Sequence, residues 1–234
     1  MTSSQELRIT GALAPEKHVQ EDATPPRPRS GVERFTGGGT DGNERLTAAT
    51  GIVLVALLAI IGLTLLALRP LLSVHLFVGM LLIGPVALKM ASTGYRFMRY
   101  YSRDTAYRHV GPPLLLLRVI APIVVITTVG VLASGVALLF VGPSSRETLL
   151  PLHKASFVIW LIFTGLHVLG HLPGLPAALR ADYTRHEGLP GYQPGRAGRL
   201  LSLVGALTAG AVIAVLTLPQ FGPWLHTHDF FVNH

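Results

Sequence analysis

The chain of 234 residues contains no cysteine. This absence excludes disulfide bonds, iron–sulfur clusters held by thiolates, covalently attached c-type haem and zinc sites with cysteine ligands. A bound metal would therefore have to use histidine, carboxylate or a prosthetic group.

Charged residues are also scarce, at 13% of the chain, whereas 50% of the residues are hydrophobic. This composition is typical of a polytopic membrane protein and unusual for a water-soluble domain. The net charge is +7, but the basic residues cluster beside apolar stretches. That arrangement favours membrane topology and anionic lipid as its explanation and argues against nucleic acid as a partner.

The apolar stretches contain no Asp or Glu, which argues against a transporter built on a carboxylate proton relay. The chain has no phosphate-binding glycine loop, no His-Glu-x-x-His zinc helix and no nucleophile elbow. It also has no polar segment long enough to bind flavin or nicotinamide. These absences leave few enzyme classes that the chain could serve alone.

Five apolar stretches are long enough to cross ~30 Å of hydrocarbon at ~1.5 Å per residue. The first two are joined at Arg69–Pro70, a connection so short that it predicts an antiparallel hairpin. The fold class predicted is all-α, a polytopic membrane protein with five transmembrane helices. The predicted spans cover roughly residues 46–68, 71–93, 114–141, 148–171 and 200–218.

The chain divides into three parts by composition. Residues 1–45 are rich in proline and glycine without an apolar period, so they are predicted to be a disordered tail or, less simply, a docking segment. Residues 46–220 form the five-span domain, and residues 221–234 form a histidine-rich tail.

Arginines give the orientation. The loops at 94–113 and 172–199 each hold four arginines, whereas the opposite side offers only Arg69, Arg146 and Lys154. By the positive-inside rule, the chain is predicted to lie in the plasma (inner) membrane with a cytoplasmic amino terminus and an outer carboxyl terminus.

Two histidines lie near the outer ends of predicted spans. His75 is about four residues inside the second span and His153 about five residues inside the fourth, which places both roughly 6 to 8 Å below the edge of the apolar zone. Matched depth on two helices is what a haem ligated from both sides requires. The alternative is that each histidine only hydrogen-bonds a neighbouring helix.

The fourth span carries further polar residues on the same face. Fourteen positions at ~100° each place His167 within about 40° of the direction of His153 and roughly 21 Å deeper. His171 returns to the same face, and Ser156, Trp160 and Thr164 lie along or beside it. This face is predicted to contact protein or a cofactor and to avoid lipid.

The spacing of His153 and His167, with thirteen residues between them, resembles that of respiratory cytochrome b and related transmembrane b-type cytochromes, including ferric-reductase-like proteins. The segments Leu-His-Lys-Ala-Ser-Phe at 152–157 and Gly-Leu-His-Val-Leu-Gly-His at 165–171 also resemble uncharacterised bacterial membrane proteins of that type. The resemblance covers spans two to four. It implies haem b, with upper and lower ligands supplied by each of two helices.

The sequence departs from the two-haem pattern at Lys89, which stands fourteen positions after His75 where the family has histidine. One haem is therefore better supported than two. Lys89 could pair with a haem propionate, act as an unusual ligand or snorkel to the interface, and snorkelling is the simplest of these. Together with Arg118, it could hold propionates or an anionic headgroup.

The last eleven residues contain His226, His228, Asp229 and His234. A His-x-His-Asp cluster outside the membrane could bind copper or zinc. The simpler alternative is a tail that packs on the membrane surface through its aromatic residues.

These features predict a bundle of spans two, three and four, closed by span one or five, around one haem b ligated by His75 and His153. The function expected is electron transfer between a quinol or cytoplasmic donor and an outer-side acceptor, as the cytochrome b subunit of an oxidoreductase with a redox partner subunit. His167 and His171 are candidates for a second cofactor or a quinone-proximal site. The alternatives are a haem-free scaffold or accessory subunit, and an outer-side copper- or zinc-binding membrane protein.

Overall fold

The computed structural model describes residues 39–102, 115–171 and 195–225. Within these residues the chain forms helices and no strand. The predicted disordered tail up to position 38, and the predicted metal ligands His226 and His228, lie outside the described residues. The elements are α2 (Gly39–Leu66), α3 (Leu72–Leu81), α4 (Ile83–Tyr101), α6 (Leu115–Val141), η1 (Pro143–Ser145), α7 (Arg146–His171), α9 (Arg196–Leu216), η3 (Leu218–Phe221) and α10 (Gly222–Leu225).

The five predicted spans are confirmed. In the described part of the chain, five helical segments are long and apolar enough to cross a membrane. Large apolar side chains point away from the protein along these segments, and Ile126, Leu63 and Leu169 are 70%, 62% and 62% exposed. Such exposure suits hydrocarbon and not water. The chain is therefore a multi-pass membrane protein, and the lipid bilayer is its environment.

Two predicted boundaries were wrong. Helix α2 begins at Gly39, so residues 39–45 are helical and do not belong to a disordered tail. Helix α4 continues to Tyr101, through the first part of the predicted loop at 94–113. The extended part of α2 is bonded to α4, since Asn43 Nδ2 donates to the Ser92 carbonyl over 3.1 Å. Hydropathy predicts only the part of each helix whose side chains face lipid.

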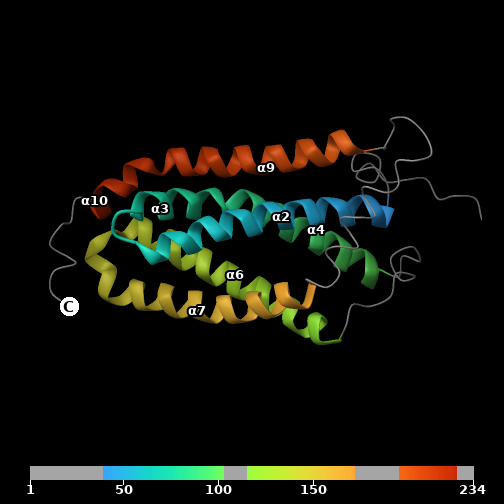
Figure 1. Cartoon of the computed structure of the whole chain (residues 1–234), viewed down its shortest axis with the longest axis horizontal. Coiled ribbons are helices and arrows are strands. Elements are labelled where there is room, and N and C mark those ends of the chain that lie inside the picture. Colours follow the sequence, from blue (N-terminus) through green and yellow to red (C-terminus); the bar gives the residue numbers. More distant parts are fainter. Residues whose placement is uncertain (1–38, 103–114, 172–194, 226–234) are drawn as a thin grey trace, which may run out of the picture.

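The hairpin at Arg69–Pro70 is present between α2 and α3. A second tight turn joins α6 to α7, where Gly142 has φ +79°, in the left-handed region that glycine tolerates, and η1 follows from Pro143. Both turns and α10 lie at one end of the molecule, at the left of Figure 1. We call this the hairpin end, and the opposite end, where α2 and α9 begin, the loop end.

The helices form two groups. Helices α2, α3, α4 and α9 pack together, and α6 packs along α7 in a separate antiparallel pair. Figure 1 shows α9 along the upper edge, α2 with α3 and α4 in the middle, and α6 with α7 below. Span two therefore packs against spans one and five, and span four against span three. The predicted bundle of spans two, three and four was wrong in this respect.

The first group is held by a close backbone crossing. Span two is divided into α3 and α4 at Leu82, because Pro85 has no N–H to donate to the Leu81 carbonyl. Helix α9 approaches the backbone at this break so closely that a Cβ at Gly210 would overlap the Leu81 carbonyl. Likewise, a Cβ at Gly84 would overlap the Ala206 carbonyl. Small residues allow this crossing, which fixes span two to span five.

The two groups meet in a small apolar core near the hairpin end. Met80 of α3, Leu139 of α6, Ala214 of α9 and Phe221 of η3 are all buried and in contact. Helix α7 contributes no buried residue to this core. The second group is therefore attached to the first through α6.

Candidate cofactor site at the two histidines

His75 lies in the first turn of α3 and is held by the hydroxyl group of Thr64 on α2. The Thr64 Oγ1 atom is 2.8 Å from His75 Nδ1. Thr64 Oγ1 also lies 2.6 Å from the Ile61 carbonyl, to which it can donate. In the tautomer with the Thr64 proton on that carbonyl, His75 donates from Nδ1 and Nε2 keeps its lone pair.

His153 lies in the second turn of α7 and has an analogous arrangement with α6. Its Nδ1 atom is 3.0 Å from Ser134 Oγ, which bonds the Val131 carbonyl over 3.1 Å. Ser156 Oγ lies 3.1 Å from Ser134 Oγ and donates to the His153 carbonyl over 2.9 Å. In the tautomer with the Ser134 proton on the Val131 carbonyl, His153 donates from Nδ1 to Ser134 Oγ and Nε2 is unprotonated.

The position of the His153 ring depends on Gly135. A Cβ added there would lie 3.1 Å from Cε1 of the imidazole, tighter than nearly all real contacts of this kind. The glycine therefore leaves the space that the ring occupies between α6 and α7. Since Ser134 is 8% exposed and Thr64 is 2% exposed, both imidazole partners are shielded from competing solvent.

The two histidines belong to different helix groups, and both lie within two turns of the hairpin end, His75 in the first turn of α3 and His153 in the second turn of α7. Helices α3 and α7 nevertheless share no extensive interface. The His153 ring also bonds the backbone of Val131 on α6. Among the described residues, no hydrogen-bond partner is recorded for His75 Nε2.

The polar face predicted on span four contacts α6. Trp160 Nε1 donates to Thr128 Oγ1 of α6 over 3.0 Å, and Ser156 reaches Ser134 as described above. The Thr164 hydroxyl group is buried and has no partner among the described residues. The face therefore contacts protein, which is one of the two options that the sequence left open.

The remaining candidates are not gathered at this pair. His167 is fourteen residues further along α7, which is about 21 Å along a helix. His171 ends α7 and Arg118 lies in the first turn of α6, and their side chains are outside the description. The structure does not bring these three residues to His75.

Lys89 is also separate from the histidine pair. Its Nζ atom donates to the Thr47 carbonyl of α2 over 2.7 Å. The side chain therefore reaches across to the neighbouring helix, whereas the simplest sequence interpretation had it snorkelling to the interface.

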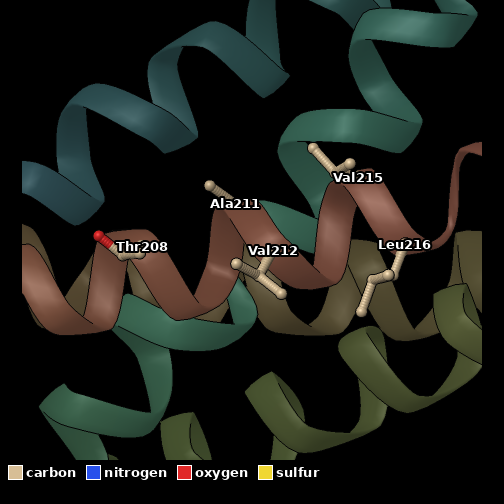
Figure 2. A pocket seen from close by; sticks show the side chains of 5 residues that line it. All are labelled: Thr208, Ala211, Val212, Val215 and Leu216. Atoms are coloured by element: carbon tan, nitrogen blue, oxygen red, sulfur yellow. The ribbon is translucent and has the colours of Figure 1, made fainter.

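The described residues offer no other metal site. No group of three or more His, Cys, Asp or Glu that could hold an ion occurs within them. Two apolar depressions lie on the surface, one along α9 (Figure 2) and one between α3 and η3. No histidine lines either depression. The case for a cofactor therefore rests on the ligand atoms of His75 and His153, not on a cavity.

The sequence interpretation did not identify Thr64 and Ser134 as the partners of the two imidazoles. The only feature of the sequence that indicated these two residues was a hydroxyl side chain inside an otherwise apolar span. Such side chains most often bond a carbonyl of their own helix. Thr127 does so, since it donates to the Ile123 carbonyl over 2.8 Å.

The comparisons with known proteins add no family. No family model matches the chain, and no curated protein and no solved structure shows significant similarity to it.

Proposed function

We propose that this chain is a membrane electron-transfer protein that holds one b-type haem between His75 and His153. The supporting observation is the common state of the two imidazoles. In each, Nδ1 lies within hydrogen-bond distance of a shielded hydroxyl group on an adjacent helix, 2.8 Å for His75 and 3.0 Å for His153. The tautomer that donates from Nδ1 leaves Nε2 unprotonated, the state in which imidazole binds a metal. Histidines that ligate metals typically have their other nitrogen fixed in this way, because the bond sets both the tautomer and the ring orientation.

The separation of the two helix groups supports the same proposal. Helices in direct contact have axes ~8–10 Å apart, which is too close for two imidazoles and an iron atom in line between them. His75 and His153 are on helices that share no extensive interface, and both lie within two turns of the hairpin end. A haem ligated by both would join the two groups.

The coordination implies the kind of chemistry. Iron held by two imidazoles has no free position for a substrate, so such a haem carries electrons and does not activate a ligand. The chain's own residues supply the axial nitrogens, the hydroxyl groups that orient them and an apolar surrounding. The resemblance to transmembrane b-type cytochromes agrees with this role.

The partners and orientation follow from the sequence. With the arginine-rich loop end on the cytoplasmic side of the plasma membrane, the amino terminus is cytoplasmic, the carboxyl terminus is outside and His75 and His153 lie near the outer surface. Electrons would pass from a quinol or cytoplasmic donor to an outer-side acceptor. The chain would act as the cytochrome b subunit of an oxidoreductase with a redox partner subunit.

The test is an oxidised-minus-reduced visible spectrum of the purified protein with pyridine haemochrome quantification. The proposal predicts a b-type spectrum with about one haem per chain, lost in His75→Ala and in His153→Ala. His167→Ala is the matched control and should retain the haem. A colourless protein, produced with adequate haem supply, would rule the proposal out.

A second candidate function is a haem-free scaffold or accessory subunit. The hydrogen bonds of His75 and His153 favour it if they serve only to join neighbouring helices. His75 links α3 to α2, and His153 links α7 to α6. In this case the protein is colourless, and substituting either histidine lowers thermal stability without changing any spectrum. An outer copper or zinc site would instead be lost on truncation after Pro223, with a haem unaffected.

A further inference from the structure

A cluster of polar side chains joins α2 to α4 toward the loop end. Asn43 and Thr47 of α2 both bond Ser92, through its carbonyl over 3.1 Å and its hydroxyl group over 3.1 Å. Ser92 in turn donates to the Lys89 carbonyl over 3.0 Å. These bonds hold the two helices in register around the side chain of Lys89.

Lys89 is fixed in place by this cluster. Its ammonium group donates one of three N–H bonds to the Thr47 carbonyl over 2.7 Å, and no other partner is recorded among the described residues. A Cβ added at Gly51 would lie 3.3 Å from Nζ, so this glycine leaves the space that the ammonium group occupies. Two of the donors of Lys89 therefore remain available to a ligand.

A second cation, Arg96, lies on the same helix as Lys89 and is exposed. The two residues are seven positions apart, so they share a helix face and are separated by about 10.5 Å along the axis. Two side chains of this length can converge on one anion between them.

No described carboxylate neutralises this pair. Glu44 of α2 is exposed and forms no recorded ion pair with Lys89 or Arg96. Glu147, the other acidic residue whose side chain is described, begins α7 at the hairpin end. Two cations at the edge of an apolar zone, with no counter-ion among the described side chains, repel each other and are costly.

The surrounding residues place this pair at the membrane surface. The rings of Tyr100 and Tyr101 lie edge to face with centroids 5.4 Å apart, and Arg99 lies over the Tyr95 ring at 5.8 Å. Aromatic side chains of this kind gather at the level of lipid headgroups. Arg96 is at this level, and Lys89 is about two turns below it.

We propose that Lys89 and Arg96 bind the phosphate group of an anionic membrane lipid. Arg96 contacts it from the headgroup level, and the Lys89 ammonium group, held against α2, contacts it from below. The bound lipid would cover the end of the seam between α2 and α4. This site does not depend on haem.

The test uses the full chain in nanodiscs of phosphatidylcholine with a minority of phosphatidylglycerol, and native mass spectrometry counts the lipids retained per chain. The proposal predicts selective retention of one phosphatidylglycerol molecule. Each cation near a membrane surface typically changes such binding about five-fold, so we expect about five-fold weaker retention in Arg96→Gln and in Lys89→Gln. Lys154→Gln, which removes an exposed cation at the other end, is the matched control.

Arg96→Gln keeps the bond from Lys89 to Thr47, so it remains informative if Lys89→Gln does not fold. Equal retention in the wild type, Arg96→Gln and Lys154→Gln would overturn the proposal. Inorganic phosphate at millimolar concentration should not displace the lipid. Displacement, with phosphate binding in discs of phosphatidylcholine alone, would overturn the assignment to a lipid and indicate a site for free phosphate.

Discussion

The two helix groups are held together by different kinds of contact. In the group of α2, α3, α4 and α9, backbones meet at Gly84 and Gly210, where no side chain fits between them. In the pair of α6 and α7, side chains meet across the seam, as in the bond from Trp160 to Thr128. Close backbone packing tolerates no added atom, whereas a seam of single hydrogen bonds can lose one member at small cost.

The groups also share one feature. Each contains one histidine whose Nδ1 atom is satisfied within its own group, by Thr64 in the first and by Ser134 in the second. The tautomer that donates from Nδ1 leaves Nε2 unprotonated in both histidines. In the proposed function, a haem binds these Nε2 atoms and joins the groups beyond their shared apolar core.

The largest effect is expected at the backbone crossing. In Gly84→Val or Gly210→Val the new side chain would overlap the backbone of the facing helix, which cannot move aside as a flexible side chain could. We expect a loss of stability of at least about 3 kcal/mol, seen as aggregation or a strongly lowered melting temperature in detergent. Gly62→Val is the control, since a Cβ there meets nothing within 4 Å. Equal melting temperatures of Gly84→Val, Gly210→Val and Gly62→Val would show that α4 and α9 do not cross as described.

The next effect concerns the link between the groups. A haem ligated by a histidine of each helix group should stabilise the folded protein. The gain is about 2.7 kcal/mol when free haem is present at a hundred times its dissociation constant. Scanning calorimetry with and without added haem measures this difference. In His153→Ala the gain should disappear. A gain of the same size in that variant would contradict ligation by His153.

A smaller effect is expected when the imidazole partners are removed. Thr64→Val and Ser134→Ala leave the ligands in place but no longer fix their tautomer, so haem affinity should fall about 10- to 100-fold. Transfer of haem to an excess of a haem-scavenging protein reports this change. Thr127→Val is the matched control, because its hydroxyl group bonds only carbonyls of its own helix. Unchanged rates of haem transfer in both variants would exclude a role of the Thr64 and Ser134 hydroxyl groups in orienting the haem ligands.

The smallest effect is expected in the seam of α6 and α7. Trp160→Phe removes the bond to Thr128 and keeps most of the ring, so it should cost about 0.6 kcal/mol, the average for such bonds between membrane helices. Denaturation in mixed micelles measures it. A cost of several kcal/mol would mean that the packing of α6 on α7 is as sensitive to one substitution as the backbone crossing at Gly84 and Gly210.

Much of the fold was predictable, because hydropathy reports which segments lie in lipid. The five spans and the turn at Arg69–Pro70 follow from it. The break at Leu82 and the extension of α4 to Tyr101 do not follow from hydropathy. Pro85 was the visible signal for the break, because it cannot donate to the Leu81 carbonyl.

The candidate site was only partly predictable. His75 and His153 stand out as isolated imidazoles in apolar spans, and the sequence placed them at similar depth. Their partners Thr64 and Ser134 are eleven and nineteen positions away, on other helices, so no local pattern indicates them. The side chain of Lys89 could not be placed either, because its acceptor, the Thr47 carbonyl, lies on another helix.

The most direct test of the haem link is electron paramagnetic resonance of the oxidised protein, which reports how many imidazoles bind the iron. Ligation by both histidines predicts a low-spin ferric signal in the wild type, replaced by a high-spin signal or lost in His75→Ala and in His153→Ala. A high-spin signal in the wild type, or a low-spin signal that survives in both variants, would contradict ligation by these two histidines.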